Sequence, residues 1–357
     1  MDFPFFKKTS KSYLGIDIGT SAIKIIELSK KGERIKLENF GELKSQALYQ
    51  KPFRSFEKNT LLLLTDEIAL AIKGILKEAN IQSRFVSFSI PDYSTFFTNF
   101  ELPSMTAEEL PEAVNFEARR QIPLPISEMV LDWQIIEGKP SLDKRGEKIK
   151  ILLVVVPQEV INQYREIAKK SGLELSALEA EVFGLIRSLT DKEMGTVAII
   201  DIGAQSTTVN IVEKAILKTS HSFDIGGNEL TRVIAQSRSI DFWKADELKG
   251  KYGLLQGKDE DVSSILFPLV DSMIQEIESS IKNFYLLDGK EISKFILAGG
   301  AAYLPGFSEY LSQKLQKEVI IGDPFSKIFT PPILADTLKT MGPSFAIAVG
   351  MALREFT

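Results

Sequence analysis

Short apolar runs separated by turn residues open the chain. The alternation predicts three strands joined by two tight turns, over residues 13–18, 22–29 and 34–40. After an irregular polar stretch, residues 60–79 carry apolar side chains at a helical spacing, which predicts one amphipathic helix. The first eighty residues therefore predict a small sheet with a helix covering it.

The next stretch, residues 85–172, has the pattern strand, strand, helix, strand, strand, helix. Its first helix starts at a capping box, with Thr106 as N-cap and Glu109 three residues later, and Pro123 marks its end. The stretch has the size of a subdomain, and we expect it to be an insertion into the first half of the chain.

The opening pattern returns near the middle of the chain. The segment TVAIIDIGAQSTTVNIV has the same form as SYLGIDIGTSAIKIIEL, so that Asp17 corresponds to Asp201 and Gly19 to Gly203. Each segment has an apolar strand, an aspartate, a glycine, a small polar turn and a second apolar strand. An internal duplication of this kind predicts an α/β protein of two similar lobes with a ligand between them.

The two repeated turns have the chemistry of a phosphate clamp. We expect Gly19 and Gly203 to supply the unusual φ angles that tight turns require. Backbone N–H groups in such turns can point at phosphate oxygens. Side-chain hydroxyls add further donors, from Thr20, Ser21, Ser206 and Thr207.

Charged residues beside the turns fit the same ligand. Asp17 and Asp201, at the strand ends, can hold the water shell of Mg²⁺, which needs only one or two carboxylates. Lys24, on the returning strand, can place its ammonium near the β- and γ-phosphates. A third glycine-rich stretch, FILAGGAAYLPGF, lets the backbone approach a flat ring or a ribose at Gly299 and Gly300. Together the three stretches predict a nucleoside triphosphate site.

Composition narrows the classes of function. The 357-residue chain is 44% hydrophobic and 25% charged, and its formal net charge of −5 lacks the basic surplus of a nucleic-acid binder. It has no cysteine, which excludes disulfides and thiolate metal sites, and its single histidine, His221, lies in a strand-like stretch. No apolar run has the ~20 residues needed to span a bilayer, and the N-terminus lacks a signal-peptide core. We therefore expect a cytoplasmic protein.

The three motifs, in this order, resemble those of the actin, Hsp70 and sugar-kinase ATPase superfamily. GIDIGTSAIK is similar to its first phosphate motif, IIDIGAQSTTV to its second and ILAGGAAYLPGF to its adenosine motif. Residues 174–189 and 341–353 resemble its two connecting helices, and small residues such as Gly350 suit their close crossing. The resemblance implies a two-lobed actin-like ATPase fold of the duplicated ribonuclease H-like α/β class, with ATP and Mg²⁺ as cofactors.

Within that superfamily the chain resembles the PilM family of type IV pilus assembly proteins, relatives of the cell-division protein FtsA. The insertion at 85–172 resembles the FtsA-type subdomain, and EARRQIPLPISEMVLDW is similar to its PilM form. The resemblance implies a cytoplasmic protein recruited to the inner face of the inner membrane by the N-terminal peptide of a PilN-like membrane protein. Contacts with pilus motor ATPases and self-association stay open.

We expect the peptide to bind in a groove between residues 85–172 and the first lobe. The apolar side chains available there are on the helix at 106–121 and at Phe96, Phe97 and Phe100. The resemblance also implies boundaries: an arm at 1–12, subdomain 1A at 13–84, 173–195 and 335–357, the inserted subdomain 1C at 85–172, subdomain 2A at 196–225 and 292–334, and subdomain 2B at 226–291.

The implied nucleotide contacts follow the motifs, together with DIGGNELTRVIA and WKADELK, which resemble the part of the second lobe that packs on the nucleoside. The expected metal-binding residues are Asp17 and Asp201. The expected cofactor-binding residues are Gly19, Thr20, Ser21, Lys24, Gly203, Ala204, Gln205, Ser206, Gly227, Asp246, Lys249, Gly299, Gly300 and Ala301.

Hydrolysis of ATP requires an oriented water behind the γ-phosphate. The expected connecting helix offers Glu179 and Glu181, which point in different directions, and we take Glu179 as the catalytic residue. No strong base or arginine finger is evident, so any ATPase activity should be slow. Two other functions stay open: an FtsA-like membrane-associated filament protein and a small-molecule (sugar) kinase, although no sugar-site motif is found.

Overall fold

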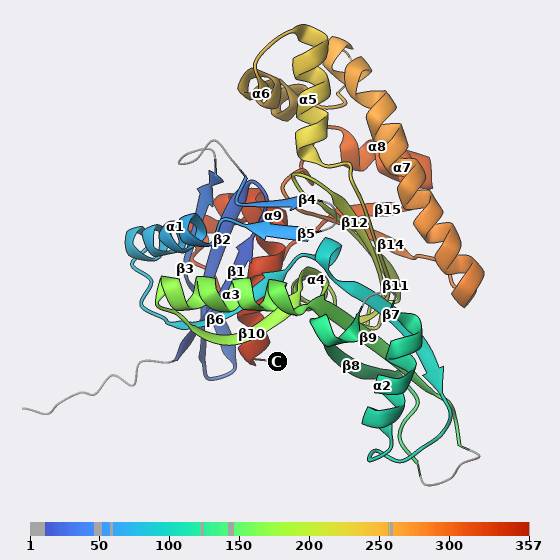
Figure 1. The fold of residues 1–357 in the computed structure, drawn as a ribbon. Helices are drawn as coiled ribbons and strands as arrows, with labels where there is room; N and C mark the ends of the chain where they lie inside the picture. The colour runs from blue at the N-terminus through green and yellow to red at the C-terminus, as the bar shows by residue number, and fades with distance from the viewer. Residues whose placement is uncertain are drawn as a thin grey trace, which may run out of the picture.

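The computed structural model describes residues 11–45, 52–57, 60–122, 125–141, 146–255, 257 and 260–356. Most of the expected N-terminal arm, residues 1–10, lies outside the described residues. Figure 1 shows two lobes, one built around β1 to β3 and the other around β11 to β15, with a small subdomain around β7 to β9 beside them.

The first lobe is built on a five-stranded sheet. Its strands run in the order β10 (Glu174–Ala180), β6 (Phe85–Ile90), β1 (Ser12–Ile18), β2 (Ala22–Lys31) and β3 (Arg34–Lys44). The hairpin of β1 and β2 is antiparallel and places Asp17 opposite Lys24, whereas β6 runs parallel to β1. The three strands expected at the start of the chain are confirmed.

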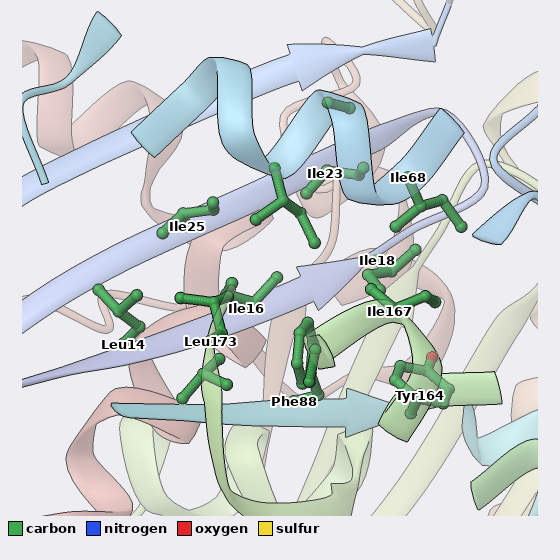
Figure 2. Close-up of a cluster of buried hydrophobic side chains, with 14 of the residues drawn as sticks. Leu14, Ile16, Ile18, Ile23, Ile25, Ile68, Phe88, Tyr164, Ile167 and Leu173 are labelled. Carbon is green, nitrogen blue, oxygen red and sulfur yellow. The ribbon is translucent and has the colours of Figure 1, made fainter. Parts of the chain in front are cut away.

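Apolar side chains join this sheet to α1 (Thr65–Glu78) and α3 (Gln158–Ser171). Figure 2 shows Ile16 and Ile18 of β1 meeting Ile68 of α1 and Tyr164 of α3 in one cluster. The helix expected at 60–79 begins at Thr65, because residues before it form β5 (Thr60–Leu63), which pairs with β4 (Arg54–Glu57).

The second lobe repeats the first. Its sheet has the order β13 (Ile216–Phe223), β12 (Thr207–Glu213), β11 (Thr196–Ile202), β14 (Lys294–Ala298) and β15 (Glu318–Ile321). Again the first hairpin is antiparallel and a later strand runs parallel to its first strand. The helices of this lobe are α5 (Gly227–Arg238), α6 (Phe242–Tyr252), α7 (Glu260–Asp288) and α8 (Phe307–Leu315).

The small subdomain is shorter than the insertion expected at 85–172. Its sheet has the order β7 (Phe96–Leu102), β9 (Ile149–Pro157) and β8 (Met129–Glu137), and α2 (Leu110–Gln121) packs on it. Both ends of the expected insertion pack with the first lobe instead. Strand β6 is buried between β1 and β10, and the apolar face of α3 packs against α1. These two elements lack partners in the small sheet, so burial assigns them to the larger core.

Two helices connect the lobes, α4 (Glu181–Leu189) and α9 (Ala335–Leu353). They cross with almost no space between them: a Cβ on Gly350 would lie 1.9 Å from the backbone oxygen of Gly184. The helix expected at 174–189 is wrong in its first half, because residues 174–180 form β10. Short single-turn helices complete the fold, at Asp92–Ser94, Ile126–Glu128, Pro332–Leu334 and Arg354–Phe356.

Candidate functional site between the lobes

A cavity of about 600 Å³ lies between the two lobes. Its walls include both repeated turns, the start of α4, the loop after β14 and part of α6. Every residue expected to bind the cofactor or the metal lines this cavity. The structure therefore brings together three motifs that are separated by up to 280 residues in the sequence. His221 is not among them; it lies on β13 beside Glu276 (Nε2–Oε2 3.5 Å).

The two repeated turns, residues 19–22 and 203–206, have the same geometry and are called the phosphate turns below. Gly19 N–H donates to the Ala22 carbonyl at 2.9 Å, and Gly203 N–H donates to the Ser206 carbonyl at 2.9 Å. The expected unusual φ angles are absent, since neither glycine has a positive φ. Crowding explains the glycines instead: a Cβ would lie 2.9 Å from the Ala22 oxygen in one turn and 3.0 Å from the Ser206 oxygen in the other.

Helix α5 starts against the second phosphate turn. Gly227 N–H donates to the Gly203 carbonyl at 2.9 Å, and Asn228 N–H donates to the Ala204 carbonyl at 2.8 Å. The positive end of the helix dipole therefore points at the wall of the cavity, where it favours an anion.

Asp17 is the carboxylate of the first lobe in this cavity. Its Oδ1 accepts a hydrogen bond from Ser89 Oγ at 3.0 Å, and its Oδ2 lies 3.7 Å from Lys24 Nζ. The ammonium expected to reach the phosphates is thus held beside the first strand-end carboxylate.

Asp201 is the equivalent carboxylate of the second lobe. Burial, together with the charges of Glu181 and Asp17, raises the pKa of Asp201 to about 7. Its buried Oδ1 has no hydrogen-bond partner among the described residues. Gly299, with φ +87°, makes room for it, because a Cβ there would lie 2.5 Å from that oxygen. Asp201 therefore has one buried carboxylate oxygen without a hydrogen-bond partner among the described residues, although Lys24 and Arg54 act on its charge from a distance.

This pair of carboxylates fits Mg²⁺ bound to a nucleotide. Within the described ranges, no three carboxylate or imidazole groups are arranged to hold a metal ion directly. A nucleotide-bound Mg²⁺ needs fewer protein ligands, since phosphates and water complete its coordination. Asp17 and Asp201 satisfy that smaller requirement, and the unpartnered oxygen of Asp201 is where a cation would gain most.

The sequence did not predict an ion pair that lies in the cavity beside the phosphate turns. Arg54 Nη1 of β4 donates to Glu181 Oε1 at 2.6 Å, and both side chains are largely buried. The other oxygen of Glu181 accepts a hydrogen bond from Asp92 N–H at 3.3 Å, and Asp92 Oδ1 accepts one from Val182 N–H at 3.0 Å. Arg54 follows Pro52 in a stretch without periodicity, so the sequence carries no clear signal for its role.

Glu179, the expected catalytic residue, does not line this cavity. It lies on β10 and forms ion pairs with Arg187 (3.0 Å) and Arg354 (2.8 Å). The expectation was wrong because residues 174–180 form a strand, and the helix begins only at Glu181. It is Glu181, the alternative residue, whose side chain faces the phosphate turns.

The opposite end of the cavity has a polar cluster on α5 and α6. Lys249 Nζ donates to Asp246 Oδ1 at 2.6 Å, to Thr231 Oγ1 at 2.6 Å and to the Gly227 carbonyl at 3.0 Å. Burial alone would raise the pKa of Asp246, but its hydrogen bond and charge interaction with Lys249 lower it overall. Asp246 is therefore a charged acceptor at the end of the cavity where a nucleoside would lie.

A second groove, of about 490 Å³, lies between the small subdomain and the first lobe. One wall is β8 and the other is β10, and each is an edge strand among the described strands of its sheet. Val130 and Trp133 of β8, Leu178 of β10 and Phe183 of α4 supply apolar surface. We call it the edge-strand groove.

Most of the side chains expected to line such a groove lie elsewhere, although the ring of Phe97 packs against Phe183 of the groove wall. Leu110, Val114 and Ala118 of α2 are buried in the small subdomain's own core, and Phe100 joins them. Phe116 is exposed on the far side of α2. A helix that covers a three-stranded sheet uses its apolar face for that sheet, so α2 is not a wall of the groove.

No helix among the described residues has both the length and the apolarity required to cross a bilayer.

Two repeated lobes, two phosphate turns and a nucleotide-sized cavity between them define a protein with the actin-like ATPase fold. The sequence matches the family described as "Type IV pilus assembly protein PilM" over residues 15–356, and the chain belongs to that family.

Solved structures of the same fold and curated sequence relatives are similar to the chain. A chain of the PilM-PilN type IV pilus biogenesis complex is similar at TM-score 0.82 and 24% identity, covering 97% of this chain and 98% of that chain. MreB 5 of Spiroplasma citri bound to AMPPNP is similar at TM-score 0.53 and 12% identity, covering 97% and 96%. Cell division protein FtsA of Staphylococcus epidermidis is 22% identical over 378 residues, 94% of this chain and 79% of that protein.

Proposed function

We propose that this member of the PilM family binds Mg·ATP between its lobes and holds the N-terminal peptide of a PilN-like membrane protein in the edge-strand groove. The single observation that carries the first half is the pair of matching phosphate turns that face one cavity, each next to a strand-end aspartate. Similar folds hold such ligands: the MreB 5 neighbour is bound to AMPPNP, and the PilM neighbour comes from a complex with PilN.

In this proposal the phosphate turns bind the phosphates with backbone N–H groups and hydroxyls, and the polar cluster at Lys249 and Asp246 binds the nucleoside. Asp17 and Asp201 hold Mg²⁺, which neutralises phosphate charge when bound. The buried Asp201 oxygen, which accepts no hydrogen bond from the described residues, would then contact that cation.

The proposed binding of Mg·ATP is tested with the Asp17→Asn variant. We expect calorimetry to show Mg·ATP binding by the wild-type protein and an affinity about tenfold or more lower in the variant, because a metal ligand loses its charge. Binding measured in EDTA should change little. Asp66→Asn, on the exposed surface of α1, is the matched control and should bind like the wild type. Absence of Mg·ATP binding by the wild-type protein would contradict the proposal.

The peptide half rests on the shape of the edge-strand groove. An extended peptide can pair with an open strand edge, and both walls offer one, β8 and β10. Apolar side chains such as Trp133 and Phe183 lie between the edges and can bury alternate side chains of the peptide. The groove also lies within the region in which the sequence predicts peptide binding.

The proposed peptide binding is tested with the Val130→Glu variant. The probe is a labelled synthetic peptide with the cytoplasmic N-terminal sequence of the PilN-type protein from the same organism. We expect micromolar or tighter binding by the wild-type protein and a loss of about tenfold or more in the variant, because the new carboxylate would be buried by the peptide. Leu70→Glu places the same charge on an exposed apolar position of α1 and should bind normally. Crosslinks from the peptide to residues 196–334 would overturn this half.

A further inference from the structure

We propose that Arg54 is the protein ligand of the terminal phosphate of a bound nucleoside triphosphate, and that binding exchanges its ion pair with Glu181 for that phosphate. The inference rests on the proposed nucleotide site. It adds a residue outside the three sequence motifs and a reason why the site would distinguish a triphosphate from a diphosphate.

Arg54 is attached to the first phosphate turn. Phe53, the residue before it, is fully buried, and its N–H donates to the Thr20 carbonyl at 3.1 Å. The Phe53 carbonyl accepts a hydrogen bond from Leu64 N–H at 3.2 Å, which ties β4 to the start of α1. The backbone of Arg54 therefore keeps its place relative to the phosphate turn, while its long side chain can change partner.

The guanidinium of Arg54 has donors to spare. It has five N–H groups; Nη1 donates to Glu181 Oε1, and the buried Tyr164 hydroxyl is a further hydrogen-bonding neighbour. Its Nε is buried without a hydrogen-bond partner. A buried guanidinium that lines a cavity and uses so few donors fits an oxyanion, whose several oxygens accept from the same planar fork.

The charges around Arg54 make the exchange favourable. Burial disfavours its positive charge, but Glu181 and Asp17 more than offset this and raise its pKa. At the same end of the cavity, Asp201 lies among these carboxylates and its pKa is raised. A terminal phosphate placed there would lie near Asp17, Glu181 and Asp201. Lys24 is already paired with Asp17, so Arg54 is a further cation available to the phosphate beside Mg²⁺. A diphosphate lacks that group and would leave the ion pair intact.

The exchange also changes Glu181. Once Arg54 turns to the phosphate, one oxygen of Glu181 is free, while the other keeps its hydrogen bond from Asp92 N–H. A free carboxylate oxygen beside a terminal phosphate can accept a hydrogen bond from water. Arg54 is thus a positioning residue for Glu181 as well as a phosphate ligand.

The experiment compares ATP and ADP affinities, with Mg²⁺, by calorimetry for three variants of the full chain. Arg54→Gln should weaken ATP binding about tenfold or more and ADP binding less than about threefold, because a charge-assisted contact is lost only with the triphosphate. Glu181→Gln should act in the opposite direction and tighten ATP binding, since Arg54 no longer has to leave an anion. Arg34→Gln, an exposed arginine on β3, is the matched control and should match the wild type for both nucleotides.

Removal of one partner from a buried ion pair can destabilise the fold. The double variant Arg54→Gln/Glu181→Gln removes both charges at nearly constant shape, and it should fold and still fail to prefer ATP. Equal losses of ATP and ADP affinity in Arg54→Gln, or weaker ATP binding in Glu181→Gln, would assign Arg54 a purely structural role and overturn the inference. Failure of the wild-type protein to bind either nucleotide would instead refute the proposed function itself.

Discussion

At the scale of single residues, the cavity is dominated by carboxylates that burial holds close together. Asp17 has Ser89 and Lys24 as neighbours, whereas the buried oxygen of Asp201 has no hydrogen-bond partner in the part of the chain that the structure describes. The two aspartates occupy the same position in the two repeats but differ in their environment. Burial and the charges of Glu181 and Asp17 raise the pKa of Asp201 to about 7.

The raised pKa predicts how stability depends on pH. When no nucleotide or Mg²⁺ is bound, the fold favours the protonated form of Asp201. Its contribution to the free energy of unfolding is therefore fully present below pH 4 and is lost as the pH rises to about 7. The Asp201→Asn variant has no carboxyl group to ionise at this position, so its free energy of unfolding does not fall in this way as the pH rises. We expect the variant to gain about 4 kcal/mol in free energy of unfolding over the wild type between pH 4 and pH 8, with no further gain above.

Chemical denaturation at a series of pH values, without nucleotide or Mg²⁺, measures this difference. Leu70→Ala, at an exposed position of α1 that has no titrating group, serves as the control and should show a constant difference from the wild type. A constant difference for Asp201→Asn as well would mean that the fold does not raise the pKa of this carboxylate.

At the scale of elements, the joint between the lobes is the crossing of α4 and α9. Gly184 and Gly350 meet backbone to backbone, and Arg187 Nη1 donates to the Gly350 carbonyl at 2.9 Å. Small residues in α9 predict such a crossing, and the resemblance implied its partner within residues 174–189, where α4 is found. The expected partner helix included residues 174–180, whose pairing with β6 was not visible in a pattern that suits helix and strand alike.

Two glycine-to-alanine changes separate packing from helix propensity. Gly350→Ala puts a methyl group 1.9 Å from the Gly184 oxygen, and we expect it to lower the free energy of unfolding by about 3 kcal/mol. Gly74→Ala lies on α1, where a Cβ would meet nothing within 4 Å, and it should raise that free energy by about 0.5 to 1 kcal/mol. Thermal and urea unfolding of both variants measures the contrast. Similar effects in the two variants would mean that the helices do not cross this closely in solution.

At the scale of the whole molecule, the two lobes share a cavity that neither could form alone. The phosphate turns, Glu181 and the polar cluster of Lys249 and Asp246 come from separate elements. A water molecule can be ordered between Glu181 and a phosphate only when all of them are in place. Glu181 is engaged by Arg54 and by Asp92 N–H in the nucleotide-free protein. Chemistry should therefore be slow even where binding is tight.

We accordingly expect the isolated chain to hydrolyse less than about one ATP per minute. A phosphate-release assay with saturating Mg·ATP measures this, and Glu181→Gln should lower the rate further while ATP still binds. A turnover of many per second would contradict the prediction and favour an enzymatic role, such as the sugar kinase that the sequence leaves open.

The sequence by itself determined the parts of this protein that depend on neighbours along the chain. The repeated strand, aspartate and glycine pattern was enough to predict two lobes and the phosphate turns, because hairpin geometry and strand alternation are local. The cavity residues on those turns were predicted from the same pattern. The family assignment rested on the same motifs and on the form of the insertion.

Only the tertiary structure decided what depends on burial by distant segments. It moved β6 and α3 into the first lobe, replaced Glu179 by Glu181 at the cavity, and brought Arg54 from an irregular stretch to the phosphate end. It also put the peptide groove between two strand edges, since α2 uses its apolar face for its own sheet. Local patterns cannot assign these roles, because an apolar or charged side chain acquires its partner only when the cores form.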